Sequence, residues 1–173
     1  IPDDWWKTCT FKEELLYAIK SGDVWLNKVK YDKDGNRIYG NVCLEVYLPS
    51  RGTCLLQHIN LGAATVGDLE SAFVDGMTQL CELHAKTNVD ASGEYLSPDI
   101  DRQVGLGMLG LANMLRRYKV SYKEFGQGLE DMLAGRLSAS AGYALADAFR
   151  TAVEAAAEVA RAHSMVRAFA VAP

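Results

Sequence analysis

Three side chains that could act together on a small molecule stand at every second position in the first third of the sequence. They are an amide, a thiol and a carboxylate: Asn41, Cys43 and Glu45, in the segment YGNVCLEVYLP. Apolar residues alternate with other types over residues 42–48, and this alternation predicts an extended strand. In a strand the three side chains would share one face at a spacing of about 7 Å. We therefore expect them to line one pocket.

The trio favours the chemistry of a neutral thiol. A carboxylate close to a thiol raises the thiol pKa, so the pairing disfavours a cysteine nucleophile. No histidine adjoins Cys43 in the sequence to act as its base, although His58 could approach in space. Hydrogen-atom chemistry at the thiol fits better, with Glu45 taking a proton and Asn41 holding hydroxyl groups. Cys54, at the start of the next extended segment, could lie across from Cys43 as a second redox thiol.

The same pattern also fits an ordinary strand, in which Cys43 is a small buried apolar residue and Glu45 faces solvent. The protein would then be a non-catalytic α/β module that serves in binding or assembly, with a coincidental cysteine strand. Spacing alone does not separate the two interpretations.

Composition excludes several classes of protein. The chain has 173 residues, 49% of them hydrophobic, and a formal net charge of -4. Its basic residues are scattered, so we expect no direct DNA binding. No apolar run is long enough to span a bilayer, and we expect a cytoplasmic protein without membrane association. The four cysteines match neither a secreted disulfide framework nor a paired CxxC zinc site, so reduced thiols are expected.

Both ends of the chain predict a fragment. The sequence opens at Ile1 without a methionine and closes on an apolar run, residues 165–173, that ends in proline. We expect the core of the domain to be completed by segments outside these residues, so that some apolar faces lack partners.

Periodicity and turn residues predict one α/β unit that would position the trio. A Thr-x-x-Glu capping box at Thr10 begins a short helix that stops at Gly22, and Asp34-Gly35 forms a tight turn. No internal repeat divides the chain. Extended segments are predicted at 24–29, 37–39, 42–48 and 54–61, a loop at 88–98, and further helices at 68–86, 102–118, 123–133 and 138–163.

Three segments, in this order, resemble the catalytic barrel of the ribonucleotide reductase large subunit: GNVCLEVYLP, CLLQHINLGA and DRQVGLGMLGLANML. In that family an Asn-x-Cys-x-Glu segment sits at the tip of a finger loop inside a ten-stranded α/β barrel. A Cys-x-Leu-x-x-x-Asn-Leu segment lies on a neighbouring strand. Asn41, Cys43 and Glu45 match the first motif in full. The second motif is matched by Cys54, Leu56, Asn60 and Leu61. The resemblance implies that residues 1–173 are part of such a barrel, truncated at both ends.

The resemblance also implies an activity, the reduction of ribonucleotides to the deoxyribonucleotides that DNA replication consumes. Cys43 would carry a thiyl radical that abstracts the ribose 3′ hydrogen. Glu45 would accept the proton of the 3′-hydroxyl, and Asn41 would hydrogen-bond the sugar hydroxyls. Cys54 would be one member of the dithiol that reduces the 2′ position and becomes a disulfide.

Several parts of the family's machinery fall outside this chain. The other reducing cysteine lies on a strand upstream of the finger loop, and Cys9 does not replace it. A phosphate-binding loop follows a closing Ala-Pro, which here is Ala172-Pro173. The polypeptide alone should therefore not turn over.

The implied partners are a ribonucleotide substrate and a thioredoxin- or glutaredoxin-type reductant. The radical would come from adenosylcobalamin bound to the same chain or from a separate metal-containing subunit. The short connection between Cys43 and Cys54 favours the cobalamin type.

Other motifs have simpler interpretations. Gly105, Gly107 and Gly110 spell the dinucleotide fingerprint GxGxxG, but no clear parallel strand precedes them. We expect these glycines to let a helix pack closely on barrel strands. Cys81 and His84, three apart on a predicted helix, could share a metal ion; core packing for Cys81 and partial exposure for His84 are the simpler expectation.

Three charged residues precede these glycines in the sequence. Asp99, Asp101 and Arg102 are expected to begin the helix predicted at 102–118, with local charge pairing.

Overall fold

The computed structural model of the chain describes residues 3–24, 26–41, 46–53, 55–86, 95–97, 99–165 and 167–169, the last of these by backbone alone. The fold is mixed α/β, as the sequence predicts. The elements in chain order are α1 (Trp5–Thr8), α2 (Lys12–Ser21), β1 (Lys30–Tyr31), β2 (Arg37–Gly40), β3 (Tyr47–Leu48), β4 (Leu55–Asn60), the 3-10 turn η1 (Val66–Asp68), α3 (Leu69–Lys86), β5 (Gln103–Leu109), α4 (Leu111–Arg117), α5 (Tyr122–Leu133), α6 (Ala141–Ala162) and β6 (Arg167–Phe169).

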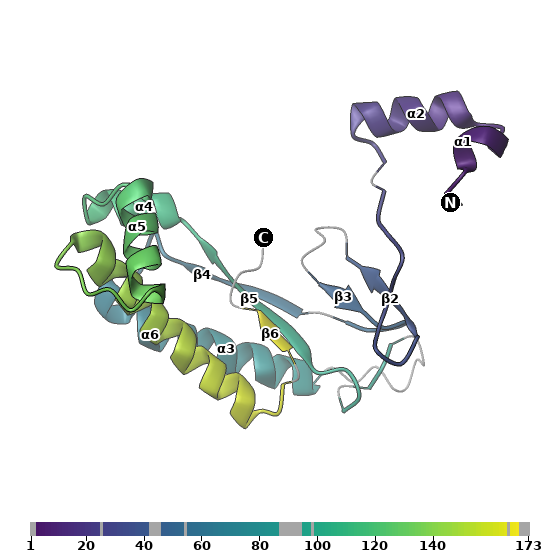
Figure 1. Ribbon diagram of the computed structural model, residues 1–173. Helices are drawn as coiled ribbons and strands as arrows, with labels where there is room; N and C mark the ends of the chain where they lie inside the picture. The colour runs from purple at the N-terminus through teal and green to yellow at the C-terminus, as the bar shows by residue number, and fades with distance from the viewer. Residues whose placement is uncertain are drawn as a thin grey trace.

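The described strands form two separate three-stranded sheets (Figure 1). Strands β1, β2 and β3 pair antiparallel, and we call them the hairpin sheet. Strands β4, β5 and β6 pair parallel, in the order of the sequence, and form the parallel sheet. Neither sheet closes on itself within the described residues.

One face of the parallel sheet builds the core. Ile59 on β4 and Val104 and Leu106 on β5 are buried against α3, and α6 packs on α3 and α5. The rings of Phe73 on α3 and Phe149 on α6 meet edge to face at 6.3 Å. Figure 1 shows α3 and α6 on the same side of the sheet.

The helices begin where the sequence places capping residues. The Asp68 carboxylate accepts hydrogen bonds from the backbone N–H and the hydroxyl of Thr65 just before α3. At α5, Ser121 and Glu124 form a reciprocal capping box. These caps and the apolar periodicity confirm the predicted helices at 68–86, 123–133 and 138–163 to within a few residues.

The turn of the hairpin sheet also follows from local sequence. Asp32 Oδ1 accepts the backbone N–H groups of Asp34 (2.9 Å) and Asn36 (2.8 Å), which closes the turn between β1 and β2. Gly35 supplies the left-handed conformation that the turn requires, with φ of 82°. The predicted tight turn at Asp34-Gly35 is thereby confirmed.

Two predicted elements and one predicted helix cap are wrong. Residues 103–109, predicted as half of a helix, form the central strand β5, because β4 and β6 pair with this segment and no local pattern records that pairing. No strand occupies the described part of 24–29, and the hairpin sheet begins at Lys30. At α2 the N-cap is Phe11 rather than Thr10, with no side-chain cap, although Gly22 ends the helix as predicted.

The first two helices differ from the others in burial. Neither α1 nor α2 contains a buried residue, and Phe11 and Tyr17 are 69% and 74% exposed. Among the described helices, none combines the length and the apolar character needed to cross a membrane.

Candidate functional site

The candidate site begins at the end of the hairpin formed by β2 and β3. In this hairpin Tyr39 pairs with Leu48 and Gly40 with Tyr47. The next pair is Asn41 with Val46: the Asn41 N–H donates to the Val46 carbonyl at 3.2 Å. The Val46 N–H lies 3.4 Å from the side-chain oxygen Oδ1 of Asn41. Asn41 therefore closes the hairpin with both its backbone and its side chain.

This closure pairs Asn41 with Val46 across the hairpin rather than along one strand. One extended strand would separate residues 41 and 46 by about 16 Å, whereas the two are hydrogen-bonded to each other. Of the strand predicted over 42–48, Tyr47–Leu48 pairs as a strand, and residues 42–45 lie outside the described residues. Cys43 and Glu45, which stand between Asn41 and Val46 in the sequence, lie outside the described residues, and so does Cys54, the residue before β4 in the sequence.

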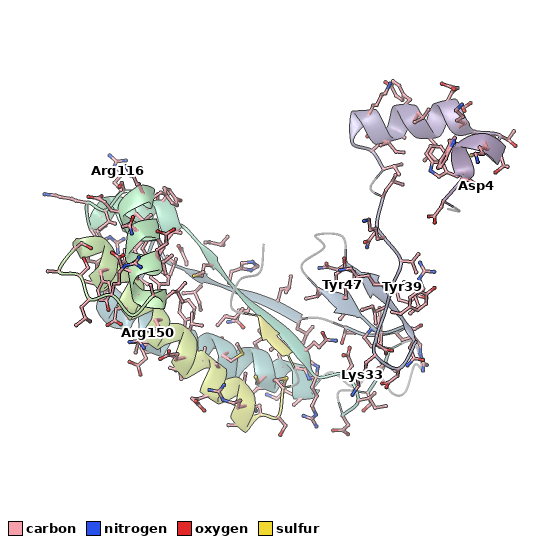
Figure 2. The ribbon with its side chains drawn as sticks, viewed as in Figure 1. Asp4, Lys33, Tyr39, Tyr47, Arg116 and Arg150 are labelled. Atoms are coloured by element: carbon pink, nitrogen blue, oxygen red, sulfur yellow. The ribbon has the colours of Figure 1, made fainter. Side chains whose placement is uncertain are left out.

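A hollow of about 330 Å³ adjoins Asn41 on the hairpin sheet. Its lining includes Tyr39, Asn41, Ser50 and Arg51, so it offers amide, hydroxyl and guanidinium groups to a polar ligand. The guanidinium of Arg37 lies 4.6 Å from the centre of the Tyr39 ring. Figure 2 shows Tyr39 and Tyr47 on the hairpin sheet, apart from the helices that carry Arg116 and Arg150.

Of the described residues of the second motif, Asn60 and Leu61 stabilise the fold around β4. Asn60 ends β4, and its Oδ1 accepts the Gly62 N–H at 3.0 Å, which stabilises the turn after the strand. Leu61 is fully buried, and its N–H donates to the Leu109 carbonyl at 2.8 Å. Leu56 is 43% exposed, on the face of the sheet opposite the core.

The short connection between the two motifs, residues 49–53, is held by a buried carboxylate. The backbone N–H of Thr53 donates to Asp101 Oδ2 at 2.8 Å. Asp101 is 5% exposed, and its Oδ1 accepts the side-chain amide of Gln103 at 2.7 Å. The prediction that Asp101 begins a helix is wrong, because the residue is buried two positions ahead of strand β5.

His84 completes this buried polar group. It is 2% exposed, and its Nε2–H donates to the Asp101 carbonyl at 2.9 Å. The prediction of a partly exposed His84 is therefore wrong, because α3 turns this side chain toward the start of β5. His84 Nδ1 and Gln103 Oε1 are buried without a hydrogen-bond partner among the described residues.

The two described cysteines contribute no reactive thiol to this group. Cys81 is fully buried on α3, and burial raises the pKa of its thiol. Core packing is therefore confirmed for Cys81. Cys9 is half-buried near the start of the chain. Within the described residues no three side chains of His, Cys, Asp or Glu gather as metal ligands.

The glycines of GxGxxG act differently from the prediction. Gly105 and Gly107 lie within β5 and alternate with the core residues Val104 and Leu106, so they do not face the helices. The close helix–strand approach is instead made by Gly76 on α3.

Gly110 has a separate role at the junction of β5 and α4. It is left-handed, with φ of 74°, and a Cβ there would lie 2.8 Å from the Gly62 nitrogen. The two glycines let the turns that follow β4 and β5 touch, and Gly110 thus serves chain packing at this junction.

The described site therefore consists of an amide at the end of a hairpin and a buried polar group that holds the connection to β4. Comparison of the sequence with models of known protein families and with curated proteins produced no match.

Proposed function

We propose that the chain is part of the catalytic subunit of a ribonucleotide reductase, which converts ribonucleotides to deoxyribonucleotides by thiyl-radical chemistry. The observation that carries the proposal is the hairpin closed by Asn41 and Val46. The sequence puts Cys43 and Glu45 between these two residues, and the family that the sequence resembles carries the same trio at the tip of a finger loop.

The parallel sheet supports the proposed ten-stranded α/β barrel. Strands β4, β5 and β6 follow one another in space as in the sequence, with α3 and α6 on one side (Figure 1). Sequential parallel strands with helices on a single face are the repeating unit of α/β barrels, whereas doubly wound sheets carry helices on both faces. Further strands would extend the sheet beyond β4 and β6.

In this proposal each residue of the trio has one task. The Cys43 thiyl takes the hydrogen atom from the ribose 3′ carbon, and Glu45 accepts the proton of the 3′-hydroxyl. Asn41 hydrogen-bonds the sugar hydroxyls, and its backbone pairing with Val46 fixes where the amide stands. Cys54, with a second cysteine from another segment, supplies two electrons and two protons to the 2′ position, so that the 2′-hydroxyl leaves as water and the pair becomes a disulfide. Cys43 then returns the hydrogen atom to the 3′ carbon.

The reaction also needs a reductant protein and a source of the radical. A thioredoxin- or glutaredoxin-type protein would reduce the disulfide again. The radical is supplied by adenosylcobalamin or by a separate metal-containing subunit.

The test uses the full-length gene product that contains these residues. Deoxyribonucleotide formation is measured with a dithiol reductant, in separate reactions with adenosylcobalamin and with a candidate radical subunit. Cys43→Ser is expected to reduce the rate by at least about 10³-fold, because a residue that reacts covalently cannot be bypassed. The control is Cys9→Ser, the same substitution at the half-buried cysteine that caps the C-terminus of α1. This variant should form deoxyribonucleotide at the wild-type rate.

Unchanged deoxyribonucleotide formation by a folded Cys43→Ser protein would refute the proposal. A wild-type protein that is inactive with every radical source would favour the non-catalytic α/β module instead.

A further inference from the structure

The two sheets of the molecule are joined by a short connection with little packing around it. Residues 49–53 follow β3 and end two positions before β4 begins at Leu55, and Figure 1 shows the hairpin sheet standing away from the parallel sheet. A cavity of about 560 Å³ lies where the two approach, lined by Ile38 and Tyr47 on one side and Asp101 and Gln103 on the other. The position of one sheet relative to the other therefore depends on a few contacts.

Asp101 makes the central contact. Its Oδ2 accepts the Thr53 N–H at 2.8 Å across 48 positions of sequence. A Cβ on Gly52 would lie 2.8 Å from the same oxygen and 2.9 Å from the Pro49 ring, so only glycine lets the connection approach this closely. The Leu96 N–H, which donates to the Arg51 carbonyl at 2.8 Å, adds a second tie.

Asp101 is itself held from three directions. Gln103 donates to Oδ1 at 2.7 Å, His84 donates to its carbonyl at 2.9 Å, and its own N–H donates to the Ser97 carbonyl at 3.0 Å. With 5% exposure, the carboxylate has little access to water as an alternative partner. A buried carboxylate with such fixed partners is a rigid anchor, because moving it would leave charge-assisted hydrogen bonds unmade.

We propose that Asp101 is a positioning residue that fixes residues 52–53, and so sets the distance between the hairpin that carries Asn41 and the start of β4 that follows Cys54. This inference rests on the proposed function, since the two segments must act on the same ribose. Asp101 touches no reacting atom in this scheme. It acts through the backbone of Thr53.

The first test measures the anchor without activity. Hydrogen–deuterium exchange of the Thr53 amide is followed by mass spectrometry in the full-length protein. In Asp101→Ala the amide loses its acceptor, and exchange should accelerate by at least about tenfold. In Asp101→Asn the side-chain oxygen still accepts the Thr53 N–H and Gln103 can turn its amide oxygen toward the new NH₂ group, so exchange should stay near wild type.

The second test measures the consequence for the reaction. Asp101→Ala should lower kcat for deoxyribonucleotide formation by about 100-fold, the size expected for a misplacement near 1 Å, with KM unchanged. Asp101→Asn should recover most of kcat. Gly128→Ala is the control for an effect of lower stability alone, because its added Cβ would clash between α5 and α6, away from Asp101. It should leave kcat unchanged at temperatures where every variant is folded.

The outcomes separate the two proposals. If the wild-type protein forms no deoxyribonucleotide, the proposed function fails, while the exchange of Thr53 still reports on the anchor. If the wild type is active and Asp101→Ala leaves either Thr53 exchange or kcat unchanged, the positioning role of Asp101 is refuted.

Discussion

At the scale of single residues, Gly110 is a position where backbone conformation and close packing coincide. Its φ is 74°, and a Cβ would lie 2.8 Å from the Gly62 nitrogen and 3.2 Å from the Gly62 Cα. The two nearest neighbours are backbone atoms of Gly62, which cannot move aside as the end of a flexible side chain could. The glycine is therefore required by chain geometry, independently of any bound nucleotide.

Gly110→Ala should lower the free energy of unfolding by about 2–4 kcal/mol, the sum of left-handed strain and a backbone clash. Gly135→Ala is the matched control, since Gly135 has φ of 67° but nothing within 4 Å of the added Cβ. It should cost only the conformational strain, about 1 kcal/mol. Urea denaturation of both variants measures the difference, and equal losses would contradict the close contact with Gly62.

A second residue-scale prediction concerns the cap of α5. The hydrogen bonds that Ser121 donates from its backbone N–H and its hydroxyl hold the pKa of Glu124 below its ordinary value. A carboxyl group whose pKa is lowered in the folded state stabilises the protein above its unfolded pKa, about 4.3. That stabilisation is lost as the pH falls through the folded pKa.

Glu124→Gln should therefore flatten the decline in stability between about pH 5 and pH 3, while stability at pH 7 changes little because glutamine also serves in a capping box. Ser121→Ala, which removes the hydroxyl but keeps the N–H, should flatten it in part. Thermal unfolding at several pH values measures the slope. If stability falls as steeply with decreasing pH in Glu124→Gln as in wild type, the α5 cap does not cause that decline.

At the scale of elements, the crossing of α5 and α6 depends on two glycines. A Cβ on Gly128 would lie 2.4 Å from both the carbonyl carbon and the carbonyl oxygen of Gly142. A Cβ on Gly142 would lie 2.1 Å from the backbone carbonyl oxygen of Glu124. The helices thus touch backbone to backbone at this point. Any side chain there would push α5 away from the apolar face that α6 shares with α3.

Gly128→Ala should therefore destabilise the protein by about 1–3 kcal/mol, the usual cost of overpacking. Gly126→Ala, two residues earlier on α5, has nothing within 4 Å of its new Cβ. It should stabilise the protein by about 0.5–1 kcal/mol through helix propensity. Chemical denaturation of the pair measures both signs, and a neutral Gly128→Ala would show that the helices separate at little cost.

At the scale of the whole molecule, burial divides the chain unequally. Among the described residues one core joins β4, β5, α3, α4, α5 and α6, whereas α1 and α2 bury no residue. A helix without a buried face is marginal in water, because tertiary packing supplies most helical stability. The amino-terminal helices should therefore open without unfolding the rest.

Amide hydrogen exchange of the 173-residue chain tests this division. Amides of α2 should exchange at least about a hundredfold faster than those in the middle of α3 and α6, which open only with the whole core. Equal protection of α2 and α3 would contradict it and would indicate a contact that covers Phe11 and Tyr17.

The sequence by itself determined much of the local structure. Apolar periodicity located the long helices, and Asp34-Gly35 located the hairpin turn. These features depend on contacts between residues a few positions apart, so a short stretch of sequence is enough to predict them. The same reasoning gave the α/β class and the motifs behind the proposed function.

Only the tertiary structure decided how distant segments meet. Residues 103–109 became a strand because β4 and β6 pair with them on both sides, which no local pattern records. The pairing of Asn41 with Val46 follows from the hairpin register, and the partner of Asp101 stands 48 positions away at Thr53. A buried carboxylate is stable only where the fold brings it donors, and their identity depends on the whole chain.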